Sequence, residues 1–111
     1  MFFTSFMEKA SIIIPAYNEE KRIGSTLEEY SNYFNSINKE GLVDYEIIVV
    51  INGTTDNTEK VVEKYEKLNR KIKHLTYKKG GKGFAIIEGF KYALERNKGF
   101  IGFVDADMAT S

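Results

Sequence analysis

Short apolar runs alternate along the chain with longer segments in which apolar residues recur at helical spacing, and this alternation limits the fold more than any other feature. The runs predict four strands, over residues 10–14, 45–51, 72–77 and 100–104. Such a pattern is typical of stacked β-α units around a mostly parallel sheet, so we expect the α/β class with three main helices. Because residues 45–51 and 100–104 are almost continuously apolar, we expect both strands to be central in the sheet.

The first helix is predicted from a stripe of apolar residues at spacings of four, three, four and three. Its members are Ile23, Leu27, Tyr30, Phe34 and Ile37. Asn18 is expected to cap this helix, with Glu19 and Glu20 in the first turn, where the helix dipole favours negative charge. Gly41 offers a stop.

The second helix is expected to open at Asp56, with Glu59 completing a capping box. Its predicted buried residues are Val61, Tyr65 and Leu68. The third helix is expected to begin near Gly83 and to end at residues 97–99. Its predicted buried residues are Ala85, Ile86, Phe90, Ala93 and Leu94. His74, the only histidine, is expected at a strand margin among surface charges.

Composition narrows the function classes. Sixteen basic residues balance sixteen acidic ones, which disfavours general binding to nucleic acid. The chain has no cysteine, which excludes disulfides, thiolate metal sites and Cys nucleophiles, so we expect a cytoplasmic location. The longest apolar runs, such as residues 47–51, are too short to span a bilayer.

We expect residues 1–111 to form a single domain, because the sequence shows no repeat, low-complexity tract or linker. Residues 1–9 are expected either to be disordered or to include cloning-derived residues, with Met7 as the natural start. An apolar anchor that touches a membrane is the alternative for residues 1–7.

Four polar or glycine-containing segments follow the predicted strands. They are residues 15–20, 52–56, 78–83 and 105–107. In an open parallel sheet, ligands bind beyond the carboxyl ends of the strands, near the point where the strand order reverses. The two carboxylates of Asp105 and Asp107 can hold Mg²⁺ or Mn²⁺, which take oxygen ligands. The four segments together therefore predict a nucleotide pocket.

Each segment also has a simpler interpretation. Residues 78–83 do not have the spacing of a Walker A loop, and without a ligand they would be a solvated basic turn. Tyr17 would be a loop aromatic that packs on the first helix, and Asn52-Gly53 would be a tight turn. An Asp-x-Asp motif often only caps a strand. The order of all four segments is more specific than any one of them.

That ordered set resembles the N-terminal, donor-binding half of a family 2 inverting glycosyltransferase with the A-type nucleotide-sugar fold. The blocks that carry the resemblance are IIIPAYNEE at 12–20, EIIVVINGTTDNT at 46–58, GKGFA at 81–85 and VDAD at 104–107. Within the family, the residues after Tyr17, the Gly-Lys-Gly before the third helix and the Met108-Ala109-Thr110 ending are most similar to dolichyl-phosphate glucosyltransferases. The resemblance implies a three-layer, Rossmann-like fold.

The resemblance also implies residue roles in nucleotide binding. Pro15, Ala16 and Tyr17 would shape the base pocket, with Tyr17 against uracil and Glu19 near the ribose. Asn52 stands where the family usually has an Asp that reads the base edge, and it can still donate and accept hydrogen bonds.

On the phosphate side, the resemblance places Lys82 and Gly83 at the diphosphate. Asp105 and Ala106 would lie beside the nucleotide, Asp107 would be the principal ligand of the Mg²⁺ or Mn²⁺ ion, and Asp105 would lie near the ribose or the metal.

The implied reaction transfers glucose from UDP-glucose to a polyprenyl phosphate with inversion at the anomeric carbon. The family's acceptor-binding elements would lie beyond residue 111, so we expect a chain that is truncated after the Asp-x-Asp motif and is inactive alone. In the full-length protein, we expect it to work at the cytoplasmic face of a membrane. Two alternatives are transfer to a saccharide hydroxyl and a non-catalytic nucleotide-binding module that self-associates through its unfinished sheet. A nucleotidyltransferase is disfavoured, because the glycine-rich first loop is absent.

Overall fold

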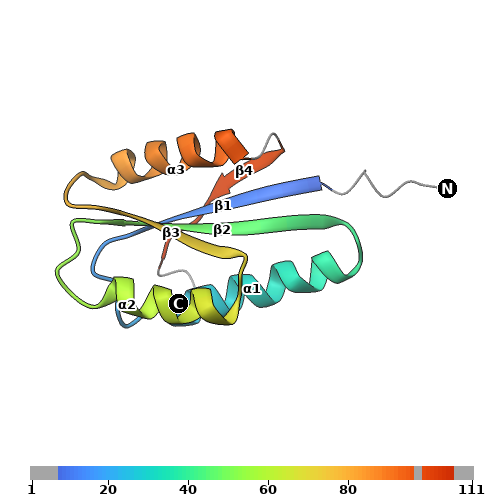
Figure 1. Cartoon of the computed structure of the whole chain (residues 1–111), viewed down its shortest axis with the longest axis horizontal. Coiled ribbons are helices and arrows are strands. Elements are labelled where there is room, and N and C mark those ends of the chain that lie inside the picture. Colours follow the sequence, from blue (N-terminus) through green and yellow to red (C-terminus); the bar gives the residue numbers. More distant parts are fainter. Residues whose placement is uncertain (1–7, 97–98, 107–111) are drawn as a thin grey trace.

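The computed structural model describes residues 8–96 and 99–106, which form a parallel sheet with helices on both faces (Figure 1). The strands are β1 (Glu8–Ala16), β2 (Val43–Asn52), β3 (Ile72–Tyr77) and β4 (Phe100–Phe103). The helices are α1 (Ile23–Lys39), α2 (Thr58–Leu68) and α3 (Lys82–Arg96). The strand order is β3-β2-β1-β4, and every neighbouring pair is parallel. The predicted α/β class and four-stranded sheet are therefore confirmed.

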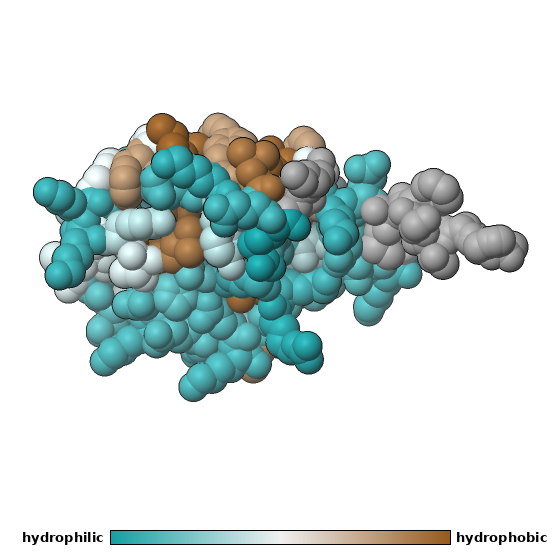
Figure 2. All heavy atoms as spheres, turned by 45° about the horizontal axis from the view of Figure 1, so that its top comes forward, coloured by the Kyte–Doolittle hydropathy of each residue, from teal (hydrophilic) through white to brown (hydrophobic). Residues whose placement is uncertain are grey.

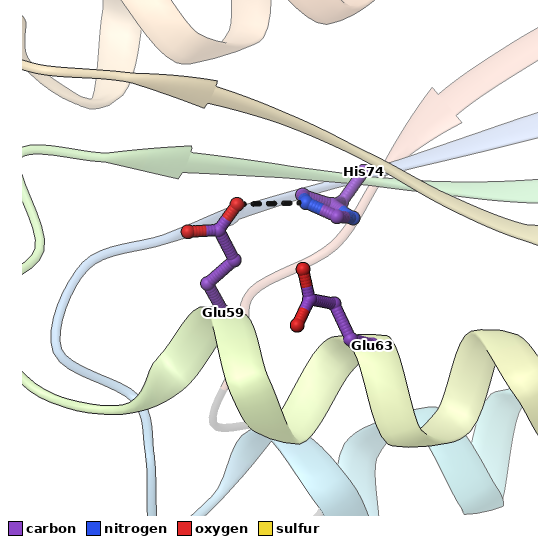
Figure 3. A group of neighbouring side chains, drawn as sticks. All are labelled: Glu59, Glu63 and His74. Atoms are coloured by element: carbon purple, nitrogen blue, oxygen red, sulfur yellow. Dashed lines mark hydrogen bonds and ion pairs between the residues drawn. The ribbon is translucent and has the colours of Figure 1, made fainter.

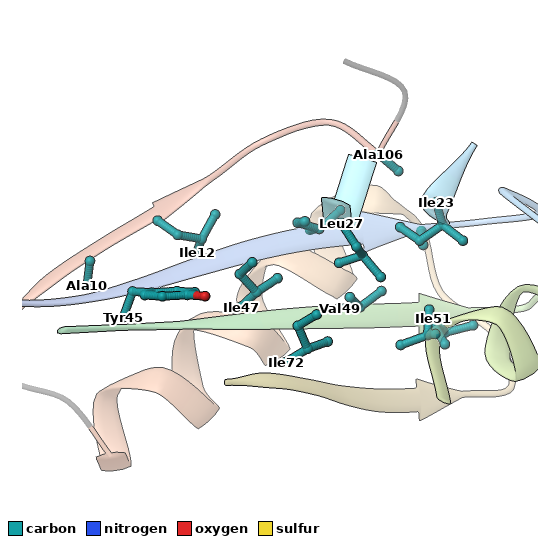
Figure 4. Packing of buried hydrophobic residues seen from close by; sticks show 13 residues of the cluster. Ala10, Ile12, Ile23, Leu27, Tyr45, Ile47, Val49, Ile51, Ile72 and Ala106 are labelled. Carbon is teal, nitrogen blue, oxygen red and sulfur yellow. The ribbon is translucent and has the colours of Figure 1, made fainter. Parts of the chain in front are cut away.

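Two apolar layers hold the helices to the sheet. On one face, α1 and α2 bring the fully buried Ile23, Leu27 and Val62 against alternate residues of β1 and β2 (Figure 4). On the other face, Ala85 and Ala93 of α3 pack near the buried side chains of Ile13, Ile48 and Val50. Because successive side chains of a strand point to opposite faces, the continuous apolar run of β2 supplies both layers.

Strand order places the edges of the described sheet at β3 and β4. β1 and β2 are central, so the expectation of a central fourth strand is wrong for the described residues. β4 has only four residues and pairs with β1 alone, and the side chains of Phe100 and Phe103 are more than half exposed. A short apolar run predicts a strand but not its place in the sheet, because the run does not show which other strands lie beside it.

The apolar stripe of α1 is confirmed, but its predicted start is wrong. α1 begins at Ile23, so Asn18, Glu19 and Glu20 precede the helix instead of forming its cap and first turn. The backbone oxygen of Glu19 accepts hydrogen bonds from the amides of Arg22 and Ile23, which closes the turn that enters the helix. Gly41, with a φ of 76°, ends the helix as expected.

The second and third helices also differ from expectation in detail. The Glu59 side chain contacts β3 instead of completing a capping box, and Asp56 accepts bonds from the amide and the hydroxyl of Thr58. Thr58 and Val62 are the buried residues of α2, whereas Leu68 is exposed. In α3, Leu94 is also exposed, and residues 97–98 of its predicted end lie outside the described residues.

His74 lies in the middle of β3 between two glutamates of α2, so its predicted place among surface charges at a strand margin is wrong. Its Nδ1 is 2.6 Å from Oε2 of Glu66, and its Nε2 is 3.0 Å from Oε2 of Glu59. Burial alone would lower the pKa of His74, but the hydrogen bonds and charges of Glu66 and Glu59 outweigh it and raise the pKa above its ordinary value. The folded protein therefore favours the imidazolium.

This raised pKa predicts a pH-dependent contribution to stability. The contribution is fully present below the unfolded pKa of about 6.5 and is lost as the pH rises through the raised folded value. His74→Gln is expected to cost on the order of 1 kcal/mol at pH 5.5 and much less at pH 9. Urea unfolding of both proteins at the two pH values measures this difference. A cost that is the same at both pH values would contradict it.

Candidate functional site

A cavity of about 520 Å³ lies at the carboxyl ends of the strands. Its lining comes from the last residues of β1 and β2 and from the segments that follow β1, β3 and β4, all within the four predicted segments. The lining residues are Pro15, Ala16, Tyr17, Glu19, Asn52, Gly80, Gly81, Lys82, Asp105 and Ala106. The strand order reverses between β1 and β4, and the cavity is lined by the end of β1 and by the segment that follows β4. This is the place where open parallel sheets bind ligands.

A second cavity of about 550 Å³ lies at the opposite, amino ends of the strands. Its charged lining is largely paired within the protein: Lys71 contacts Asp44, and Arg96 contacts Glu46. None of its lining residues comes from a described loop that follows a strand. The cavity at the carboxyl ends is therefore the better candidate, although the two are of similar size.

Asn18 fastens the loop after β1 to the loop after β2. Its backbone is in the left-handed region, with a φ of 50°, and its Oδ1 accepts hydrogen bonds from the amides of Thr55 and Asp56. In return, the Thr54 hydroxyl accepts from the Asn18 amide at 3.3 Å. Left-handed backbone is tolerated better by Asn than by most other non-glycine residues. These bonds fix the loop that carries Tyr17 and Glu19.

Two further bonds complete the same loop connection. The Glu19 amide donates to the Thr58 hydroxyl at 2.9 Å, and the Glu20 amide donates to Asp56 at 3.2 Å. The Tyr17 ring remains 60% exposed. A rigid loop thus presents an exposed aromatic face at the cavity, which suits stacking on a planar ligand.

Lys82 and Asp105 form an ion pair in the wall of the cavity. Lys82 is the first residue of α3, Asp105 follows β4, and the Lys82 ammonium lies 2.5 Å from an Asp105 oxygen. Both side chains are more than half exposed, so solvent screens the pair and it contributes little to folding. A bound cation can take the place of Lys82 beside Asp105, and a bound anion can take the place of Asp105 beside Lys82.

Thr26 of α1 holds the segment after β4. Its fully buried hydroxyl lies within hydrogen-bond distance of the Ala106 carbonyl and 3.1 Å from the Arg22 carbonyl. Ala106 is itself buried in the apolar layer beneath α1. The position of Asp105 is therefore set by contacts on both sides of it, from α3 through Lys82 and from α1 through the neighbouring Ala106.

Asn52 presents an unsatisfied acceptor. Its Nδ2 donates to the Gly81 carbonyl at 2.9 Å, and this bond fixes the orientation of the amide. Its Oδ1 is buried and finds no hydrogen-bond partner among the described residues. Buried polar atoms in native proteins are almost always paired, so this acceptor is available to a hydrogen-bond donor in the cavity.

The structure brings most of the predicted site residues to one cavity. Pro15, Ala16, Tyr17, Glu19, Asn52, Lys82, Asp105 and Ala106 all line it. Gly83 is outside the lining, and Asp107 lies outside the described residues. Gly80 and Gly81 lie in the predicted pocket segment 78–83 without a predicted role of their own, and sequence reasoning missed Thr26 and the contacts of Asn18. The Gly-Gly doublet was the available signal, since Gly80 has a φ of 126° and a Cβ there would lie 2.4 Å from the Phe84 ring.

Comparison with known families decides the class of this site. The sequence profile described as "Glycosyl transferase family 2" matches residues 11–111, which include all of the cavity lining. The chain belongs to glycosyl transferase family 2. The resemblance to this family seen in the sequence is therefore confirmed.

Curated relatives include two kinds of transferase. The dolichyl-phosphate beta-glucosyltransferase of Dictyostelium discoideum is 37% identical over 109 residues, which cover 90% of this chain and 31% of the relative. The human enzyme of the same name is 37% identical over 107 residues, covering 93% and 32%. The poly(ribitol-phosphate) beta-N-acetylglucosaminyltransferase TarS of Staphylococcus aureus is 38% identical over 105 residues, covering 91% and 16%. The chain therefore spans about a third or less of these relatives.

Solved structures support the fold. The mannosyltransferase PcManGT of Pyrobaculum calidifontis, in complex with GDP-Man and Mn²⁺, has a TM-score of 0.70 at 23% identity, covering 94% of this chain and 29% of that one. The glucosyl-3-phosphoglycerate synthase of Mycobacterium tuberculosis, in complex with Mn²⁺ and UDP-Glc, has a TM-score of 0.62 at 26% identity, covering 94% and 35%. The fold is thus the A-type glycosyltransferase fold.

No described helix is both long and apolar enough to cross a membrane.

Proposed function

We propose that this chain is the donor-binding part of a transferase that moves glucose from UDP-glucose to a polyprenyl phosphate with inversion. The observation that carries the proposal is the meeting of Asn52, Lys82 and Asp105 in one cavity, where they offer an acceptor, a cation and a carboxylate. The names of the dolichyl-phosphate glucosyltransferase relatives support the sugar and the acceptor class.

The residues that would hold the donor divide by chemistry. Tyr17 would stack on the uracil ring, and Glu19 would accept from the ribose hydroxyls. Lys82 would exchange Asp105 for the diphosphate, since both offer oxyanions to its ammonium. Asp105, with Asp107 from outside the described residues, would hold a divalent cation through oxygen ligands.

The donor set fits Mg²⁺ or Mn²⁺ better than a softer metal, because it consists of carboxylates. Mn²⁺ occurs in the complexes of both solved relatives named above, which supports Mn²⁺ as the ion used in the tests. When bound, the ion would supply charge neutralisation of the departing UDP.

The transfer itself needs one bond formed and one broken. An oxygen of the acceptor phosphate forms a bond to the anomeric carbon from the face opposite UDP, and the bond between that carbon and the UDP oxygen breaks with its electron pair. Since the second pKa of a phosphate monoester is about 6, the acceptor is already largely anionic near neutrality. The chain's residues therefore need to bind, orient and stabilise charge more than to remove a proton.

Calorimetry with UDP-glucose, with and without Mn²⁺, tests the proposed donor site. We expect binding that requires the ion and that is greatly weakened by Asp107→Ala. Circular dichroism of each protein checks that it is folded. Equal binding with and without Mn²⁺ in folded protein, unchanged by Asp107→Ala, would refute the assigned site.

The hydrogen bonding of Asn52 leads to a separate prediction about which base the site prefers. Its single unsatisfied acceptor matches uracil, which has one N–H donor on its pairing edge, better than guanine, which has an N–H and an amino group there. UDP is therefore expected to bind more tightly than GDP. Asn52→Ala is expected to weaken UDP binding about tenfold, the value of one hydrogen bond in a buried site. Competition calorimetry measures both; tighter binding of GDP, or an unaffected Asn52→Ala, would contradict it.

Transfer to a hydroxyl is the second candidate. It is favoured by the 38% identity to TarS, whose name gives poly(ribitol-phosphate) as its acceptor. Assays of a longer parent protein on polyprenyl phosphate and on saccharide or polyol acceptors distinguish the two. Activity on hydroxyl acceptors alone would favour this candidate over the first.

Self-association is a third candidate, favoured by exposed apolar side chains on α3 and β4. Ile87 and Leu94 of α3 and Phe100 and Phe103 of β4 are each more than half exposed, and Figure 2 shows apolar surface gathered over α3. Edge strands and apolar patches promote association. Light scattering at increasing concentration measures it, and a monomer throughout would argue against this candidate.

A further inference from the structure

Three acidic side chains of α2 surround the imidazole of His74 on the helix-covered face of β3. Glu59 and Glu63 are four residues apart, so they share one side of α2, and both turn toward His74 (Figure 3). One potential ligand atom from each of Glu59, Glu63 and His74 lies within 4.8 Å of the other two. This cluster lies three residues before the end of β3, outside the lining of the donor cavity.

We propose that Glu59, Glu63 and His74 form a zinc site that is separate from the donor site. An imidazole nitrogen with two carboxylates is a ligand set that zinc uses, and an imidazole ligand favours zinc over Mg²⁺. A water molecule would complete a tetrahedral site.

The contacts of His74 give its two ring nitrogens different roles. Glu66 lies 2.6 Å from Nδ1 and can accept the Nδ1 proton, whereas zinc would displace the Nε2 proton that faces Glu59 in the imidazolium. A carboxylate that accepts from the distal nitrogen of a metal-bound histidine is the usual arrangement around zinc. Glu66 would thus orient the ring without touching the ion.

A second contact positions the Glu59 carboxylate. The Thr76 hydroxyl donates to Oε2 of Glu59 at 3.0 Å, from the next residue on the same side of β3 as His74. Two of the proposed ligands are therefore held by neighbouring hydrogen bonds before any ion binds.

Zinc binding would require only small movements: the wider separations of up to 4.8 Å would shorten, and the 3.0 Å contact between His74 and Glu59 would lengthen slightly. Tetrahedral oxygen and nitrogen ligands about 2.1 Å from zinc lie roughly 3.4 Å apart. Glu63 is exposed and Glu59 is partly exposed, so both side chains can rotate toward the ring, while His74 is held by the sheet. Zinc would replace the direct contact between Glu59 and His74 and would tie α2 to the edge strand β3.

Nuclear magnetic resonance of the imidazole tests this site, because His74 is the only histidine in the chain. Zn²⁺ is added to untagged, ¹⁵N-labelled chain near pH 7.5 after treatment with a chelator. We expect one equivalent of Zn²⁺ to shift the Nε2 signal and to leave Nδ1 protonated, and we expect equimolar Mg²⁺ to change neither signal. An unchanged Nε2 signal in the presence of one equivalent of Zn²⁺ would overturn the proposal.

Matched variants locate the ligands. Glu63→Gln is expected to weaken zinc binding at least tenfold, and Glu66→Gln about tenfold through the orientation of His74. Glu95→Gln, an exposed glutamate on α3, is the control and should bind zinc normally. Asp105→Ala should also bind zinc at His74 normally, which separates this site from the donor site. Equal zinc affinity of Glu63→Gln and Glu95→Gln would overturn the assignment.

Discussion

Asp105→Ala is expected to bind UDP-glucose about 100-fold more weakly than the unaltered chain in the presence of Mn²⁺, because the loss of a charged ligand in such a site costs roughly 3 kcal/mol. The variant is also expected to keep its stability. The ion pair between Lys82 and Asp105 is exposed on both sides, and exposed pairs contribute about 0–1 kcal/mol. Calorimetry and urea unfolding measure the two effects separately.

Asp44→Ala is the matched control for this prediction. Asp44 and Lys71 are also 2.5 Å apart and partly exposed, but they lie at the amino ends of the strands. Removal of this pair should change donor binding by less than twofold. Equal loss of binding in both variants would mean that the effect comes from charge in general, and unchanged binding in Asp105→Ala would remove Asp105 from the donor site.

Gly89→Ala is expected to destabilise the fold by about 1–3 kcal/mol, although alanine favours helices over glycine by about 1 kcal/mol. Gly89 lies in α3 where the helix crosses the sheet, and a Cβ there would lie 2.6 Å from Cγ2 of Ile13 and 3.2 Å from Cγ2 of Val50. Both neighbours are fully buried, so neither has free space to move into. Gly89→Val should cost more.

Gly83→Ala gives the control in the same helix. Nothing lies within 4 Å of a Cβ at Gly83, so this variant should be as stable as the unaltered chain or slightly more so. Urea unfolding of both variants measures the difference. If Gly89→Ala proved as stable as Gly83→Ala, the close packing of α3 on β1 and β2 would be wrong.

The main elements were predictable because the apolar residues of each form a recognisable pattern. The stripe from Ile23 to Phe34 and the continuous run of β2 each record a buried face, and both predictions are confirmed. The position of β4 was not predictable in the same way. Its short apolar run is compatible with an edge or a central strand, and the choice depends on which strands lie beside it.

The polar connections escaped prediction for a different reason. Asn18 looks like a helix cap because capping residues and loop residues are of the same types, and only the fold places it beside Thr55 and Asp56. Glu59 similarly fits a capping box, yet β3 offers it His74 and Thr76. The convergence of the four loops was predictable from the parallel sheet, because the carboxyl ends of all its strands point in the same direction.

The most direct test of the donor site is a map of where the donor and its ion bind. In ¹⁵N-labelled chain, UDP-glucose with Mg²⁺ is predicted to shift the amide signals of Ala16, Asn52, Gly81 and Ala106. Traces of Mn²⁺ should then broaden the signals of Asp105 and Ala106 first. No shifts at millimolar donor, or shifts confined to Lys9, Arg70 and their neighbours at the amino ends of the strands, would contradict the proposed function.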